Sequence, residues 1–156
     1  MAWITPIYNR TLADVTNKTS IGVFNVLDWN RITGNIAVVL VMANANVLLN
    51  IAQNSLTQPT ATTIPSVVDI NNLAQNIELI RAAIGIPITT GCVPINYAYQ
   101  SGMNGISPNY NAVNTWELDL NLIYIYLPPI INYREPCGVA ACGQAHFRQN
   151  LFRRYI

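Results

Sequence analysis

A helix-start signature followed by an apolar stripe constrains the fold of this chain more than any other feature. It is clearest in residues 25–40, NVLDWNRITGNIAVVL. The Asn25 side chain can accept a hydrogen bond from an exposed N–H of the first turn, and the negative charge of Asp28 suits the same helix end. Apolar residues then recur at helical spacing, which predicts one buried face. This stripe comprises Ile32, Ile36, Val39 and Ala43.

A second copy of the pattern occupies residues 66–81. Ser66 and Asp69 form its cap pair, and Gly85 is typical of a helix end. Its stripe comprises Leu73, Ile77, Ile80 and Ile84.

A third copy occupies residues 111–127, with Asn111 and Asn114 at the cap positions. We expect Pro128-Pro129 to end this helix, because the residue before a proline avoids the helical region. Its predicted stripe comprises Leu118, Leu122 and Ile125.

An asparagine borders the stripe at a fixed place in each copy. When Asp28, Asp69 and Asn114 are aligned as anchors, the copies are 41 and 45 residues apart, and an asparagine follows each anchor by seven positions. A half-buried amide needs hydrogen bonds, so we hypothesise that each one binds backbone groups of a neighbouring segment and fixes register. The alternative is three amphipathic helices that share common residues by chance. The register residues are Asn35, Asn76 and Asn121.

These patterns predict a mainly α fold. We expect a small bundle of three antiparallel-packed helices, formed from a degenerate repeat, with extended arms at both ends. The N-terminal arm comprises residues 1–20, the helical core residues 21–130 and the C-terminal arm residues 131–156.

The composition favours a chain whose surface is covered by other subunits. Hydrophobic residues make up 51% and charged residues only 10%, and there are 20 asparagines. Average soluble domains contain about 25% charged residues. A monomer with a neutral polar surface is the alternative. The net charge of +1 provides no general attraction for nucleic acid or an anionic membrane. We expect contacts between subunits at Trp3 and at the off-stripe residues Val38 and Val41.

The C-terminal residues 146–156 alternate aromatic side chains with arginines. Both residue types are favoured anchors at protein interfaces, so docking into a neighbouring subunit is the first interpretation. Nucleic-acid contact, or a terminal helix on its own bundle with solvated arginines, are the alternatives. The predicted interface residues of this segment are Phe147, Arg148, Leu151, Phe152, Arg153 and Arg154.

The sequence does not predict a catalytic, cofactor-binding or metal site. The single histidine, His146, has no carboxylate with a defined role nearby. Cys92, Cys137, Cys142 and His146 could bind zinc, Cys137 and Cys142 could form a disulfide, or the cysteines could be small buried residues. The most membrane-like run, residues 36–51, is interrupted by three asparagines and is short for a span of about 20 residues.

The N-terminal half resembles a known family. The residues concerned are Trp3-Ile-Thr-Pro6, then Asn9-Arg10-Thr11-x-Ala13-Asp14-Val15, then Asn25-x-x-Asp28-x-Asn30-Arg31-Ile32-x-Gly34-Asn35-Ile36. They are similar to the opening of small virion proteins encoded by tailed bacteriophages and prophages of gut Firmicutes. The chain departs from this family at Ile7-Tyr8, where Lys-Thr is usual, and lacks the charged insertion common after the Asp14 position.

The resemblance covers roughly the first 85 residues and implies a non-enzymatic virion protein present in many copies. Its place would be the tail tip, the baseplate or the fibre attachment region. A head-side decoration or connector protein, or a membrane-associated lysis-type protein, are the alternatives. We expect partners to be further copies and other virion proteins, with no nucleic acid or membrane partner and no cofactor. The expected location is the virion, assembled in the host cytoplasm.

Overall fold

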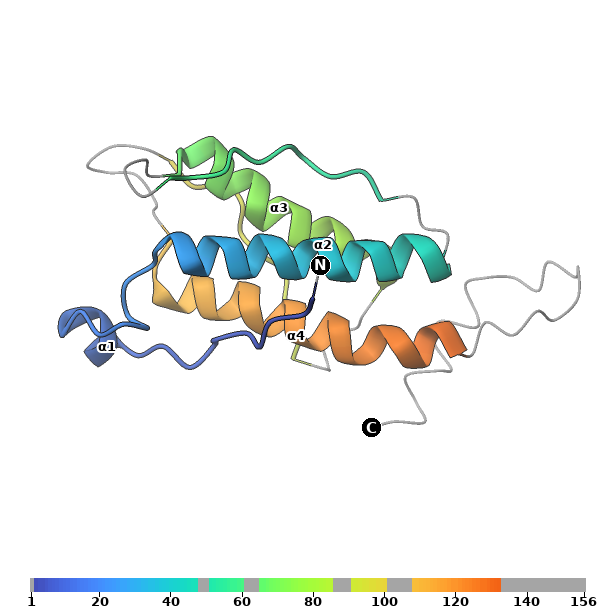
Figure 1. Ribbon diagram of the computed structural model, residues 1–156, viewed down its shortest axis with the longest axis horizontal. Coiled ribbons are helices and arrows are strands. Elements are labelled where there is room, and N and C mark those ends of the chain that lie inside the picture. Colours follow the sequence, from blue (N-terminus) through green and yellow to red (C-terminus); the bar gives the residue numbers. More distant parts are fainter. Residues whose placement is uncertain (1, 48–50, 61–64, 86–90, 101–107, 133–156) are drawn as a thin grey trace, which may run out of the picture.

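Three long helices form the core of the protein in the computed structural model, which describes residues 2–47, 51–60, 65–85, 91–100 and 108–132 (Figure 1). They are α2 (Val26–Val47), α3 (Val67–Ile84) and α4 (Tyr110–Asn132), and each packs against the other two. A short helix, α1 (Leu12–Thr16), lies within the N-terminal arm. The predicted mainly helical three-helix bundle is confirmed. The C-terminal arm, from residue 133 onward, lies outside the described residues.

The three long helices run in the same direction, so the prediction of antiparallel packing is wrong (Figure 1). Each is preceded by a non-helical segment that runs the opposite way along the bundle. We call residues 2–11, 51–60 and 91–100 the lateral segments. A helix of 22 residues is about 33 Å long, and about ten extended residues cover that distance. The links between the helices are therefore long enough to return the chain to the same end of the bundle.

The predicted starts of the first two long helices are confirmed. Asn25 Oδ1 accepts the N–H of Leu27 at 2.8 Å, and Asp28 Oδ2 accepts the N–H of Asn25 at 3.1 Å. Ser66 and Asp69 form a reciprocal capping box at the start of α3. Gly85 ends α3 in the left-handed conformation with φ 73°, which glycine adopts without steric cost.

The predicted limits of the third helix are wrong at both ends. Asn109, and neither Asn111 nor Asn114, caps α4, because its Oδ1 accepts the N–H of Ala112 at 3.0 Å. The helix also continues through Pro128-Pro129 to Asn132. A proline removes one helical hydrogen bond and weakens a helix near its end, but it does not have to stop it there.

The buried face of α4 also differs from the predicted one. Leu118 and Leu122 are only half-buried and Ile125 is 52% exposed, so the predicted stripe is not the most buried face of α4, although Leu122 packs against the core. The cap residues of the three helices, Asn25, Ser66 and Asn109, are 41 and 43 residues apart in the sequence. The same two offsets separate the corresponding residues of the three buried stripes. The observed stripe of α4 comprises Trp116, Leu120, Ile123 and Leu127, matching Ile32, Ile36, Val39 and Ala43 of α2 and Leu73, Ile77, Ile80 and Ile84 of α3.

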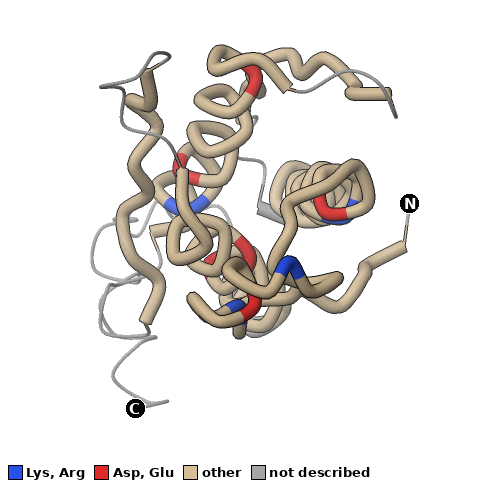
Figure 2. The backbone as a smooth tube through the Cα atoms, turned by 90° about the vertical axis from the view of Figure 1, so that its left-hand side faces the viewer, with Lys and Arg blue, Asp and Glu red and all other residues tan. Residues whose placement is uncertain are grey.

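The core is therefore built from layers in which each long helix contributes one residue. The helices form a triangle when viewed end-on (Figure 2). The lateral segments add Cys92, Ile95 and Tyr99 to the buried set. This regular arrangement agrees with three related units, although an origin of these units by duplication stays a prediction.

One helical segment among the described residues, Val26–Ala45, has the length and apolar character needed to cross a membrane, with a mean hydropathy of 1.2. Half of it is buried inside the bundle, and core helices of soluble proteins meet the same criterion. It contains Asp28 and Arg31, which are both buried: Arg31 pairs with Glu117 of α4, and Asp28 pairs with Arg10 and Arg31.

Candidate functional site

Four charged side chains form a buried cluster where the N-terminal arm meets α2 and α4. Arg10 Nη2 binds Asp28 Oδ1 at 2.9 Å and Glu117 Oε1 at 2.8 Å. Arg31 binds Glu117 through Nε at 2.8 Å and through Nη2 at 2.6 Å, and also binds Asp28. Two arginines thus share two carboxylates, and the cluster has no net charge.

The cluster also binds the backbone of the arm. Glu117 Oε2 accepts the N–H of Ile7 at 2.7 Å, and Arg10 donates from Nε to the carbonyl of Ile21 at 3.0 Å and from Nη1 to that of Ile7. Burial opposes the charge of Arg31, but its hydrogen bonds to Glu117 and Asp28 raise the pKa of the guanidinium. Because both carboxylates are engaged by arginines, the geometry suits the fixing of the arm rather than proton transfer.

Four asparagines each hold one residue of a lateral segment by two hydrogen bonds. In each case the side-chain Oδ1 accepts the N–H and Nδ2 donates to the C=O of the same residue. We call this arrangement an asparagine clamp. The four clamps are Asn35 on Ile4 (2.9 and 2.7 Å), Asn76 on Asn54 (2.7 and 3.0 Å), Asn71 on Tyr99 (2.9 and 3.0 Å) and Asn114 on Arg10 (3.1 and 2.8 Å).

The hydrogen bonds that the register hypothesis requires are thus present at Asn35 and Asn76. They are absent at Asn121, whose half-buried side chain makes no hydrogen bond to another described residue. The reason is that the alignment predicted from the sequence places the third copy two residues too late. The α4 residue that is structurally equivalent to Asn35 and Asn76 is therefore Asp119. Asn114, taken as a cap from the sequence, is a clamp. That these contacts fix the register stays a prediction.

The clamps follow the threefold arrangement of the helices. Each lateral segment lies between two helices, and the backbones of the first and third segments are bound at equivalent positions by a side chain from each of the two helices. Asn35 of α2 and Asn114 of α4 hold residues 2–11, while Asp119 of α4 and Asn71 of α3 hold residues 91–100. Asn76 of α3 holds residues 51–60.

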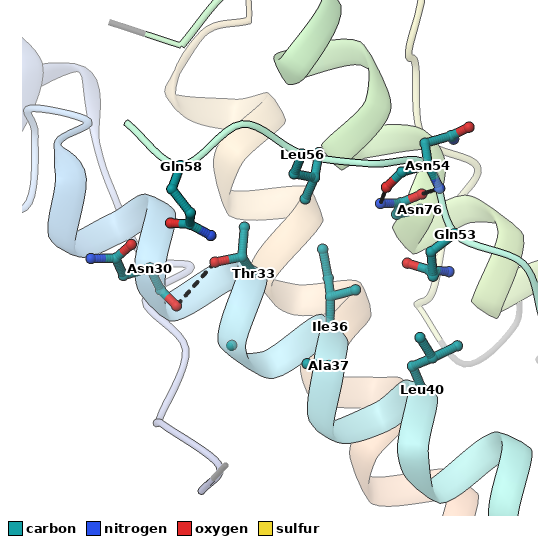
Figure 3. A pocket seen from close by; sticks show the side chains of 11 residues that line it. Asn30, Thr33, Ile36, Ala37, Leu40, Gln53, Asn54, Leu56, Gln58 and Asn76 are labelled. Atoms are coloured by element: carbon teal, nitrogen blue, oxygen red, sulfur yellow. Dashed lines mark hydrogen bonds between the residues drawn. The ribbon is translucent and has the colours of Figure 1, made fainter. Parts of the chain in front are cut away.

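Asn30 of α2 is the position equivalent to Asn71 of α3 and Asn114 of α4. Unlike those two asparagines, it does not bind a lateral segment among the described residues. Its exposed side chain makes no hydrogen bond to another described residue and lines a groove of about 490 Å³ between α2 and residues 53–58 (Figure 3). Gln58 lies opposite Asn30, and the amide of Gln53 is buried near the other end without a described partner. The remaining lining residues are Thr33, Gly34, Ile36, Ala37, Leu40, Asn54, Leu56 and Asn76, so the groove carries no charge.

A second cluster of ionisable groups lies between α3, α4 and residues 91–100. Asp119 is fully buried, and its Oδ1 accepts the N–H of Val93 at 3.2 Å. Glu78 pairs with Arg81 at 2.5 Å and accepts the N–H of Ile95 at 3.2 Å. Burial raises the pKa of Asp119 to about 6.

Cys92 lies beside Asp119 and is a free, buried thiol. Burial, together with the nearby Asp119 carboxylate, raises the pKa of this thiol, so it stays protonated and is a poor nucleophile. No group of three or more potential metal ligands occurs among the described residues. Cys137, Cys142 and His146 lie outside them, so the zinc and disulfide alternatives stay open there.

The predicted interface residues have different environments. Val41 is 66% exposed and Val38 is half-buried. Trp3 is half-buried and stacks on Tyr124 of α4, with ring centroids 4.0 Å apart, so one face of its ring is used within the chain. The other predicted interface residues, Phe147, Arg148, Leu151, Phe152, Arg153 and Arg154, lie outside the described residues.

Sequence reasoning missed the charge cluster and the role of Asp119. Asp28 was assigned only to the helix start, where it does act, but its Oδ1 also anchors both arginines. A signal was present, since Glu117 stands between Trp116 and Leu118 in an apolar helix, where a carboxylate needs a buried partner.

Comparison of the chain with protein-family models, with curated proteins and with solved structures gives no match.

Proposed function

We propose that this protein is a non-enzymatic structural component of a bacteriophage virion, which assembles in many copies at the tail tip, the baseplate or the fibre attachment region. The observation that carries the proposal is that the described residues expose few free charges and many apolar side chains. The sequence resemblance of residues 3–36 to small virion proteins supports the same assignment.

The charged side chains of the described residues are mostly used inside the protein. Arg10, Asp28, Arg31 and Glu117 form one cluster, and Glu78 pairs with Arg81. Asp14 and Asp69 complete capping boxes at the starts of α1 and α3. Such a surface carries little of the mixed charge that keeps a small monomer soluble.

Large apolar side chains are exposed on all four helices. Leu27 is 75% exposed, and Val41 and Val68 are each 66% exposed. Scattered apolar residues are normal on a protein surface, but together with so little charge they favour burial in an assembly. The remaining large exposed residues are Ile4, Tyr8, Leu12, Val15, Val23, Leu79, Val93, Tyr97 and Ile125.

Light scattering coupled to size exclusion tests the assembly in solution. We expect a mass well above the 17.3 kDa of one chain at micromolar concentration. Val41→Lys should reduce that mass without lowering the melting temperature, because the side chain is exposed in the single chain. Val68→Lys makes the same change on α3, so a comparison of the two variants shows which helix takes part in the interface. An unchanged mass in Val41→Lys would show that the interface does not include Val41.

Deletion of residues 146–156 tests the C-terminal docking segment. Loss of the oligomer or of partner binding with an intact helical spectrum supports docking. An unchanged assembly would contradict docking and favour one of the two alternatives, a terminal helix on its own bundle or a nucleic-acid contact.

Cryo-electron microscopy of purified particles tests the virion assignment. Density for the three parallel helices in the tail region is expected, whereas density on the capsid would indicate the decoration or connector alternative. Absence of the chain from washed particles contradicts the proposal. The lysis-type alternative predicts that the protein needs detergent, and the burial of Asp28 and Arg31 within the Val26–Ala45 helix weighs against it.

A further inference from the structure

Asn35, Asn76 and Asp119 occupy equivalent positions on α2, α3 and α4, which makes Asp119 the exception among three sites. The two asparagines each bind both the N–H and the C=O of one residue in a lateral segment. Asp119 accepts the N–H of Val93 at Oδ1, but its buried Oδ2 has no hydrogen-bond partner among the described residues. The third site is therefore half of a clamp.

Whether Asp119 can also bind the Val93 carbonyl depends on the protonation of its carboxyl group. An ionised carboxylate only accepts hydrogen bonds, so it cannot serve the carbonyl of Val93 as an amide Nδ2 would. A protonated carboxyl has one acceptor and one donor, as the asparagine amide has. Protonation of Oδ2 would therefore give Asp119 the hydrogen-bonding capacity of Asn35 and Asn76.

The groups that face Asp119 leave it without a dedicated cation. Arg81 of α3 is engaged by Glu78 through two hydrogen bonds of 2.8 and 2.5 Å, and the Cys92 thiol of the lateral segment is a weak, neutral hydrogen-bond donor to the Asp119 carboxyl. Burial is the largest influence and raises the pKa of Asp119 to about 6. The Val93 N–H, the Cys92 thiol and Arg81 oppose that shift, and Glu78 adds to it. Protonation therefore changes within a mildly acidic range of pH.

We propose that Asp119 is a protonation-dependent latch on residues 91–100. The protonated carboxyl holds Val93 by two hydrogen bonds, as an asparagine clamp does. The ionised carboxylate holds it by one, because it has no donor to offer the Val93 carbonyl. Rising pH thus loosens the Val93 end of this lateral segment.

Release is confined to that end of the segment. Tyr99 remains in the Asn71 clamp, and its ring contacts Trp116 edge-on with centroids 6.0 Å apart. Ile95 remains bonded to Glu78. The movement uncovers Cys92 and the α3–α4 surface beneath it, while the bundle stays folded.

Amide hydrogen exchange followed by NMR on the full chain tests the latch. After correction for intrinsic exchange, protection of the Val93 amide should fall by about thirtyfold between pH 4.5 and 7.5, for a carboxyl that titrates near 3.8 when released and near 6 when held. The Tyr99 amide is the internal reference and should change much less. In Asp119→Asn, which has the clamp at every pH, Val93 protection should not depend on pH.

The reciprocal variant Asn76→Asp keeps the test decisive if Asp119→Asn folds poorly. It places a carboxyl at the equivalent α3 position and should make protection of the Asn54 amide fall with rising pH. Two results would overturn the proposal: an Asp119 carboxyl signal that titrates near 3.8, or the same pH dependence of Val93 protection in the wild type and in Asp119→Asn.

Discussion

The N-terminal arm and residues 91–100 are two lateral segments in similar settings, but they are held by different chemistry. Both run opposite to the helices, and both are clamped by an asparagine near one end, Asn114 for the arm and Asn71 for the other segment. The carboxylate that binds the arm, Glu117, lies between two arginines. The carboxylate that binds Val93, Asp119, has no such partner.

The comparison shows that burial alone does not decide what an acidic residue does. At Glu117 two arginines compensate for the loss of water. At Asp119 the loss of water is compensated mainly by one backbone N–H, and the pKa rises. Residues 91–100 should therefore be held less firmly as the pH rises through about 6.

Loss of the Glu117 charge is expected to have the largest effect. In Glu117→Gln, Arg10 and Arg31 would share the single carboxylate of Asp28 and leave an uncompensated buried positive charge. The free energy of unfolding should fall by about 3–5 kcal/mol, measured by urea denaturation at pH 7. Glu78→Gln is the control, since the Glu78–Arg81 pair is partly exposed and should cost about 1 kcal/mol or less. Equal losses in the two variants would contradict the distinction.

Asp119→Asn is expected to act in the opposite direction. The folded state keeps the Asp119 proton up to a pKa of about 6, whereas the unfolded chain releases it near 3.8, so ionisation lowers stability as pH rises through this range. The variant should be more stable than the wild type at pH 7.5, by at most about 3 kcal/mol, and similar to it at pH 4.

The measurement is the difference in unfolding free energy between the two proteins across this range. Asp14, Asp69 and Glu78 have lowered pKa values and stabilise the fold above about pH 4 in both proteins, so their contributions cancel in the difference. A difference that does not change with pH would show that Asp119 is not the titrating group.

Asn35→Leu removes a neutral clamp and should cost less than the loss of Glu117. The variant leaves the N–H and C=O of Ile4 without their partners, which should lower stability by about 2 kcal/mol and free the start of the arm. Proteolysis of the arm and urea denaturation measure the two effects. The register hypothesis fails if fold, oligomer size and stability are all unchanged.

The starts of the helices were predictable where a cap residue and a following apolar stripe are unambiguous in the sequence. Asn25 and Ser66 have acidic residues three positions later, and each precedes a clear stripe, so both starts were correct. α4 was misplaced by two residues because Asn109, Asn111 and Asn114 are all suitable caps. Apolar residues also occur on both candidate faces of this helix, so periodicity did not identify the buried one.

The parts that depend on distant residues were not predictable from local patterns. Arg10 and Glu117 are separated by more than a hundred positions, and their pairing requires the parallel arrangement of α2 and α4. The links between the helices are long enough to permit that arrangement but do not require it. Hydrogen bonds to a neighbouring backbone were predictable at Asn35 and Asn76, because an amide beside an apolar stripe has a strong need for partners. That these bonds fix the register stays a prediction.

The smallest effect is expected at Asn30, the position that is equivalent to Asn71 and Asn114 but makes no clamp. Its amide is exposed and unbonded to other described residues, so Asn30→Ala should change the unfolding free energy by less than about 0.5 kcal/mol. Asn114→Ala, the matched variant, removes two hydrogen bonds to the Arg10 backbone and a longer one from its Nη1, and should cost about 2 kcal/mol. Urea denaturation of both variants shows whether the stability comes from the position on the helix or from the hydrogen bonds made there. Equal costs would show that the contacts at Asn114 add nothing, whereas a large difference shows that the hydrogen bonds to a lateral segment, and not the place on the helix, provide the stability.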